Sequence, residues 1–120
     1  MTTNLPMSPV LSAPVARYFA NEATRPEAVA RCFTEEAVVI DEHHEHRGRF
    51  AIAAWNAASR AKYNFSTEPL SSNAEGDIFT VTAKVTGTFP GSPVELCFRF
   101  TLEGNLVARL EITPRASTSS

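Results

Sequence analysis

The chain lacks the features that mark membrane proteins, disulfide-rich secreted proteins and nucleic-acid-binding proteins. Its two cysteines, Cys32 and Cys97, lie far apart at no metal-binding spacing, so we expect two reduced, largely buried thiols. No apolar run approaches the roughly 18 residues of a membrane span, and the N-terminus lacks a signal-peptide pattern. The net charge is -2, and the mixed charges form no basic stripe for nucleic acid or an anionic membrane. We therefore expect a cytoplasmic protein.

The composition is that of one soluble globular domain. A chain of 120 residues can build a single core, and 43% hydrophobic with 20% charged residues is the usual balance for one. Pro6 and Pro9 with little periodicity predict a flexible arm over residues 1–11. The polar end PRASTSS predicts a disordered tail over residues 114–120, which leaves 12–113 for the domain.

Two helices are predicted first. Ser12 can cap a helix in which Val15, Tyr18 and Phe19 recur at the helical spacing, with Glu22 as the next position of that stripe. Thr24 and Glu27 form a capping box for a second helix. The apolar face of this second helix is predicted to consist of Ala28, Val29, Cys32 and Phe33.

The remaining pattern predicts one more helix and an antiparallel sheet. Residues 37–41 and 44–47 are expected to form a small hairpin, and the alanine-rich segment 49–62 is expected to form the third helix. Alternating strands are predicted over 65–70, 78–88, 94–102 and 106–112, with SSNAEGD as a turn. The fold class is α+β, with three helices packed on the apolar face of a mainly antiparallel sheet. The polar outer face of that sheet can meet water or a second subunit.

Two longer strings carry a resemblance to a known family. FTEEAVVIDEHHEHRGRFAIAAW and ELCFRFTLEGNLVARLEIT resemble segments of SnoaL-like proteins, which belong to the nuclear-transport-factor-2-like superfamily. The resemblance implies a curved, cone-shaped α+β fold with a deep apolar pocket that holds a small apolar molecule without a cofactor. It also implies a homodimer formed through the outer sheet face. A fold, however, does not specify an activity.

The N-terminal third is also similar to the ketosteroid isomerases. The string Ala16-Arg17-Tyr18 resembles the one that carries their catalytic tyrosine, and Val39-Ile40-Asp41 resembles the one that carries their aspartate base. Their second acid has no counterpart, because Leu96 stands where it would lie, before Phe98-Arg99-Phe100. The resemblance thus implies a base and one hydrogen-bond donor, but only half of the oxyanion hole.

The candidate catalytic residues are Asp41, Tyr18 and His44. Asp41 ends an apolar strand, where partial burial would raise its pKa and make it a usable base, and Tyr18 could donate to an enolate oxygen. The alternatives are a turn residue and a satisfied core hydroxyl. His44 is placed beside Asp41, where it could tune the carboxylate or shuttle its proton. His44 and His46 would share a strand face, but zinc needs further ligands, so no metal is expected.

The candidate ligand-binding residues are aromatic, with Trp55 as the first choice because it is the single tryptophan and follows the hairpin. Core packing is the alternative for each of them. The full predicted set is Trp55, Phe33, Tyr63, Phe79, Phe98 and Phe100.

Two functions fit this sequence. One is acid–base proton transfer on a small carbonyl compound, as in an isomerase or a cyclase, with Asp41 as the base. The other is a non-catalytic ligand-binding or accessory dimeric module. Leu96 favours binding, whereas the joint presence of Tyr18 and Asp41 favours catalysis.

Overall fold

The structure, a computed structural model, describes residues 11–22 and 25–114. Its helices are α1 (Ala13–Asn21), α2 (Pro26–Arg31) and α3 (Gly48–Tyr63). Its strands are β1 (Phe33–Asp41), β2 (His44–Arg47), β3 (Ser66–Glu75), β4 (Ile78–Thr86), β5 (Val94–Glu103) and β6 (Leu106–Pro114). The strands form one sheet in the order β2-β1-β6-β5-β4-β3, in which only β1 and β6 run parallel. The predicted α+β class is confirmed.

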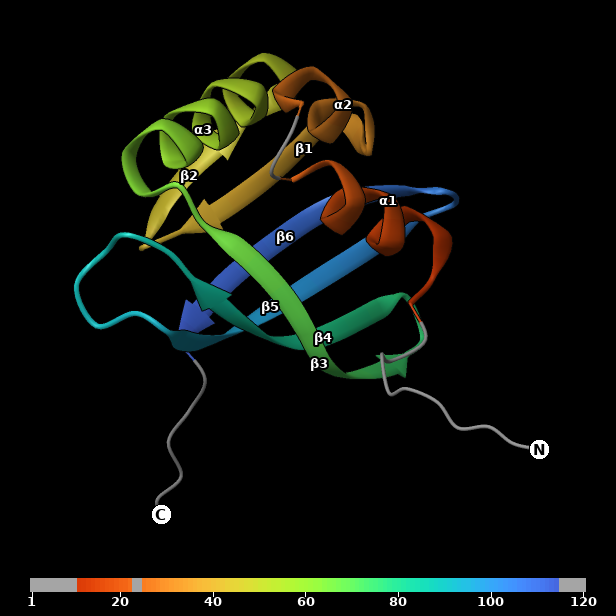
Figure 1. Ribbon diagram of the computed structural model, residues 1–120. Coiled ribbons are helices and arrows are strands. Elements are labelled where there is room, and N and C mark those ends of the chain that lie inside the picture. Colours follow the sequence, from red (N-terminus) through yellow and green to blue (C-terminus); the bar gives the residue numbers. More distant parts are fainter. Residues whose placement is uncertain (1–10, 23–24, 115–120) are drawn as a thin grey trace.

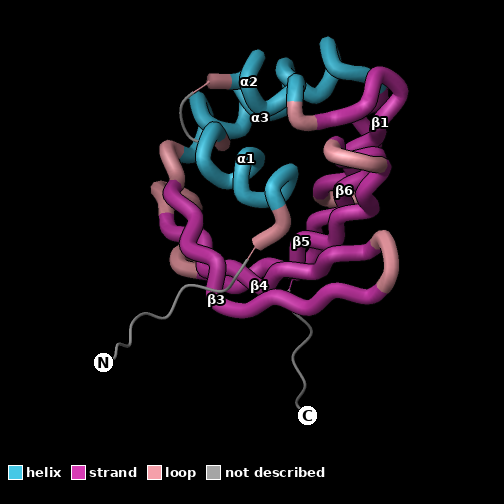
Figure 2. Tube along the Cα trace, turned by 90° about the vertical axis from the view of Figure 1, so that its right-hand side faces the viewer, coloured by secondary structure: helices cyan, strands magenta, loops and turns pink. Residues whose placement is uncertain are grey.

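The sheet bends around the helices, as Figures 1 and 2 show from two directions. In Figure 2, α1 lies inside the bend, while α2 and α3 lie across the side that the sheet leaves open. Tyr18 of α1 is fully buried and meets Phe33 and Phe100 edge to face, with ring centroids 6.1 and 5.5 Å apart. This aromatic contact fixes α1 in the bend and thereby sets one wall of the interior.

The second helix is shorter than predicted. It ends at Arg31 with Cys32 as its C-cap, and Phe33 already belongs to β1. The Cys32 carbonyl accepts a hydrogen bond from the backbone N–H of Val107 at 2.8 Å, which starts the pairing of β1 with β6. Long-range pairing of the backbone therefore overrides the local helical pattern. Arg25 occupies the N-cap, and the predicted cap Thr24 lies outside the described residues.

The segment SSNAEGD is a strand for most of its length, not a turn. Strand β3 continues to Glu75, and only Gly76 and Asp77 turn the chain, with Gly76 at φ 59°. The register shifts between Pro69 and Ser71, where a bulge accommodates a proline that cannot donate to the ladder. Turn-forming residues can lie in an edge strand when a partner strand pairs with their backbone.

The structure describes one residue of the predicted arm and one of the predicted tail. Leu11, assigned to the flexible arm, packs against the core, and Pro114, assigned to the tail, ends β6 opposite Leu96. The rest of the predicted arm and tail lies outside the described residues. In the ranges that the structure describes, no helix combines the length and the apolar character needed to cross a membrane.

Candidate functional site

A cavity of about 530 Å³ lies between the helices and the concave face of the sheet. Helix α1 contributes Tyr18 to its lining and its C-cap contributes Glu22. Strand β1 contributes Asp41, and α3 contributes Trp55 and Asn56. Further apolar lining comes from the sheet, from the connection between α3 and β3 and from the loop between β4 and β5, and includes Phe65, Val85, Phe89, Val94, Leu96, Phe98 and Ile112. The volume lies in the range of small-molecule sites.

The structure brings most of the predicted site residues together. Tyr18, Asp41, His44, Trp55, Tyr63 and Phe98 all line this cavity. Three predicted ligand-binding residues do not line it. Phe33 and Phe100 are fully buried in the core around Tyr18, and Phe79 packs against the edge of that core opposite Phe100. Both sides of the bend need large side chains to fill the space next to α1, so these three aromatics are used for packing.

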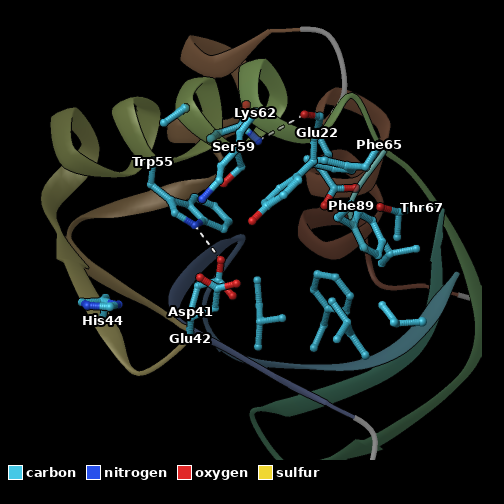
Figure 3. Close-up of a pocket in the computed structure, with 18 of the residues that line it drawn as sticks. Glu22, Asp41, Glu42, His44, Trp55, Ser59, Lys62, Phe65, Thr67 and Phe89 are labelled. Atoms are coloured by element: carbon cyan, nitrogen blue, oxygen red, sulfur yellow. Dashed lines mark hydrogen bonds between the residues drawn. The ribbon is translucent and has the colours of Figure 1, made fainter. Parts of the chain in front are cut away.

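Asp41 lies where β1 reaches the opening of the cavity. Its Oδ2 accepts a hydrogen bond of 3.0 Å from the indole Nε1 of Trp55, which Figure 3 shows as a dashed line. Burial raises the pKa of Asp41, while the hydrogen bond from Trp55 lowers it, the nearby Glu42 raises it and His46 lowers it. The net result is a half-buried carboxyl with a raised pKa, which also accepts a hydrogen bond from the backbone of Glu42.

The histidine hairpin differs from the prediction in which histidine approaches Asp41. His44 pairs with Asp41 across the β1–β2 hairpin, but it is exposed and stands apart from the carboxyl in Figure 3. His46, two residues further along β2, is half-buried, and its charge lowers the pKa of Asp41. The His46 ring is tilted relative to the Trp55 ring, with ring centroids 6.0 Å apart. His43 lies in the turn with φ 67°. Among residues 11–22 and 25–114, no group of three or more His, Cys, Asp or Glu side chains could hold a metal ion.

A second carboxyl lies deeper in the cavity. Glu22 is only 5% exposed, and the hydroxyl of Tyr18, one helical turn earlier, donates to its Oε2 at 3.2 Å. Burial raises the pKa of Glu22 to about 7, although the hydroxyls of Thr67 and Tyr18 oppose this shift. Burial, and next the charge of Glu22, raise the pKa of Tyr18 well above its usual value. Tyr18 is therefore a neutral hydrogen-bond donor at every physiological pH.

Sequence reasoning did not include Glu22 among the site residues. The available signal was a charged residue at the next position of an otherwise apolar helical stripe, in phase with Tyr18. Figure 3 places Glu22 and Thr67 on one side of the cavity and Asp41 with Glu42 on the other. Leu96 lines the wall of the cavity, so no acid occupies that position, and the second carboxyl comes from α1 instead.

Asn56 supplies a further polar group at the end that holds Glu22. It is 1% exposed, and its Nδ2 donates to the backbone carbonyl of Glu22 at 3.1 Å. Its Oδ1 is buried without a hydrogen-bond partner among the described residues. The Thr67 hydroxyl is close enough to Glu22 to oppose the rise in the pKa of that carboxyl. The hydroxyl oxygen of Thr67 is nevertheless buried without a hydrogen-bond partner of standard geometry among the described residues. This end of the cavity thus gathers buried polar atoms.

A bent sheet that encloses a helix-covered cavity defines the cone-shaped fold of nuclear-transport-factor-2-like proteins. A protein from Catenulispora acidiphila, described as having a ketosteroid isomerase-like fold in complex with trimethylamine, superposes with a TM-score of 0.76. It is 21% identical, and the match covers 82% of each chain. A "putative SnoaL-like polyketide cyclase" from Jannaschia gives a TM-score of 0.73 at 22% identity, covering 85% of this chain and 83% of that one.

Within this fold, the chain belongs to the SnoaL-like domain family, which matches residues 15–110. A solved protein from Sinorhizobium meliloti, named a "putative polyketide cyclase", is 40% identical with a TM-score of 0.83. That match covers 86% of this chain and 95% of the other. The predicted family is confirmed. A search of curated proteins finds no match to this sequence.

Proposed function

We propose that the protein transfers a proton on a small carbonyl compound, with Asp41 as the general base. The observation that carries the proposal is the half-buried Asp41 carboxyl, held by Trp55 at 3.0 Å at the edge of an apolar cavity. A base that is partly removed from water has a pKa closer to working pH and accepts a proton more effectively. The hydrogen bond from Trp55 fixes the orientation of this carboxyl at the edge of the cavity.

The Tyr18–Glu22 pair supports the negative charge that forms on the substrate oxygen. When Glu22 is ionised, the Tyr18 hydroxyl donates to it at 3.2 Å and is not available to a ligand. When Glu22 is protonated, its own O–H can donate to the Tyr18 oxygen, and the Tyr18 O–H is released toward the cavity. A neutral donor in a dry site stabilises an enolate more than the same donor does in water. The active form therefore combines ionised Asp41 with protonated Glu22.

The names of similar proteins fit this chemistry. The Sinorhizobium and Jannaschia proteins are both called putative polyketide cyclases, and a protein named SalBIII, described as an epoxide hydrolase/cyclase-like enzyme, shares the fold. In an aldol-type ring closure, Asp41 removes the proton from a carbon next to one carbonyl. The resulting enolate forms a carbon–carbon bond to a second carbonyl, whose oxygen then takes up a proton. An isomerisation needs only the first step and the return of the proton.

Exchange of hydrogen for solvent deuterium next to a carbonyl tests the proton transfer directly. We expect the protein to catalyse this exchange in a bicyclic aromatic ketone such as a tetralone, as followed by NMR. Asp41→Asn should lower the rate by at least about a hundredfold, the usual contribution of a general base. Asp77→Asn, at the exposed β3–β4 turn, is the matched control and should keep the full rate. An unchanged exchange rate in Asp41→Asn would refute the assignment.

Leu96 supports a second candidate, a binding module without turnover. It places an aliphatic side chain on the cavity wall where the isomerase pattern has an acid. In that case Asp41→Asn leaves ligand affinity nearly intact, whereas Trp55→Ala, which removes a large part of the lining, lowers it. The same ketone can be titrated into each variant by calorimetry, and no exchange should then be seen in any of them.

We also propose a homodimer through the outer face of the sheet. The exposed Lys84, Glu95, Arg99 and Arg109 lie on adjacent strands, and Arg99 pairs in register with Glu111. A face of mixed charge can be complementary to its own copy about a two-fold axis. Light scattering should give twice the chain mass of 13.1 kDa, and Arg99→Glu should shift the mass toward the monomer.

A further inference from the structure

The end of the cavity that holds Asn56 and Glu22 is built as a binding site for a hydrogen-bond donor. The orientation of the Asn56 amide follows from its neighbour, because the backbone carbonyl of Glu22 can only accept a hydrogen bond. Nδ2 must face that carbonyl, which leaves Oδ1 as the free end of a side chain that is 1% exposed and lines the cavity. An acceptor buried without a partner is costly and rare in proteins.

No residue that the structure describes satisfies this acceptor, but a ligand can. The carboxyl of Glu22 and the hydroxyl of Thr67 lie at the same end of the cavity, and both can interact with an oxygen that enters it. A ligand hydroxyl both donates and accepts, so it can give its proton to Asn56 Oδ1 while its oxygen receives one from the Thr67 hydroxyl. An ether or an alkyl group at this position would leave Oδ1 unsatisfied.

We propose that this end of the cavity binds a hydroxyl group of the substrate, with Asn56 Oδ1 as the acceptor. The substrate class is then a hydroxylated aromatic or cyclic carbonyl compound with polar groups at two ends and an apolar body between them. Its hydroxyl lies next to Asn56, its apolar body meets Phe98 and Leu96, and its acidic carbon reaches Asp41 on the opposite side. The last point rests on the proposed function, whereas the hydroxyl site does not.

Naphthol and its methyl ether are suitable probes, since they share the apolar body and differ only in the donor. Calorimetry on the wild-type protein should show naphthol binding roughly tenfold more tightly, which is what one hydrogen bond to a buried acceptor contributes. In Asn56→Leu this preference should disappear. A purely structural effect of the substitution would weaken both probes equally and keep their ratio. The same replacement at the exposed Asn73 is the matched control and should preserve the tenfold ratio.

Two further measurements keep the test decisive. If Asn56→Leu does not fold, the side-chain amide NMR signal of Asn56 in the wild-type protein should shift with naphthol and not with the ether. In Asp41→Asn the tenfold preference should persist, so a failure of the proposed catalysis and a failure of the hydroxyl site give different results. Equal affinities of the two probes for the wild-type protein, or no binding of either, overturn the inference.

Discussion

Glu22 makes the stability of the fold depend on pH, and the direction can be worked out from its burial. The pKa of this carboxyl rises from 4.5 to about 7 because it is removed from water. The folded protein therefore holds the proton more tightly than the unfolded chain does. Between about pH 4.5 and about pH 7 the folded state keeps a proton that the unfolded state has released, so the free energy of unfolding falls as the pH rises through this window.

The magnitude follows from the same two pKa values. Moving one carboxyl from 4.5 to about 7 corresponds to about 3 kcal/mol in the free energy of unfolding. This is a large share of the roughly 5 to 15 kcal/mol that a domain possesses. Glu22→Gln mimics the protonated form at every pH, because its side-chain amide is neutral and can donate to the Tyr18 oxygen. The variant should match the wild type below about pH 4.5 and exceed it by about 3 kcal/mol above about pH 7.

Urea denaturation followed by circular dichroism across this range measures the difference between the two proteins. Subtracting the curves removes the contributions of all other titrating groups, including Asp41, whose pKa is raised as well. Glu36→Gln, at an exposed position of β1, is the matched control and should follow the wild type throughout. A difference between Glu22→Gln and the wild type that does not change with pH would refute the argument from burial.

Two further predictions concern activity and the wall of the cavity. If proton transfer needs protonated Glu22, the rate of deuterium exchange should fall as the pH rises past about 7. Glu22→Gln should remove this decline, because its amide can donate to Tyr18 at any pH. An identical decline in the variant would contradict this role. Gly87→Ala should lower the free energy of unfolding by about 1 to 3 kcal/mol. The reason is that an added Cβ would lie 2.9 Å from the Tyr63 carbonyl oxygen and 3.0 Å from the Phe65 Cα. An unchanged urea midpoint would contradict this steric conflict.

The helices and strands could be predicted largely because hydrophobic periodicity is a local signal. The alternation of Phe79, Val81, Ala83 and Val85 identified β4, and a helix was expected over 49–62 where α3 runs from Gly48 to Tyr63. The errors came where partners in space decide the outcome. Phe33 joins β1 because its neighbours pair with β6, a strand more than 70 residues away in the sequence.

Asp41 could be predicted as a site residue because it is a carboxylate at the end of an apolar strand. Which side chains line the cavity and which fill the core was harder to predict from the sequence. Alternation along a strand assigns a side chain to one face of the sheet, but not to a position along the axis of the cone. Phe98 lines the cavity while Phe100, two residues further on the same face, fills the core. Glu22, directly after α1, and Asn56 of α3 meet only in the folded chain, and nothing in either local sequence indicates the other.

The loop between β4 and β5 closes one end of the cavity and is fastened to the last turn of α3. Both the backbone N–H and the hydroxyl of Thr88 donate to the Tyr63 carbonyl, at 2.9 and 2.7 Å, and Phe89 packs edge to face on the Tyr63 ring. In Figure 3 this wall lies beside Glu22 and Thr67 and away from Asp41. Replacing the segment that carries Phe89 and Pro90 should therefore change the length of the ligand that the cavity accepts without altering Asp41. Natural sequence variation in this loop could change ligand length in the same way.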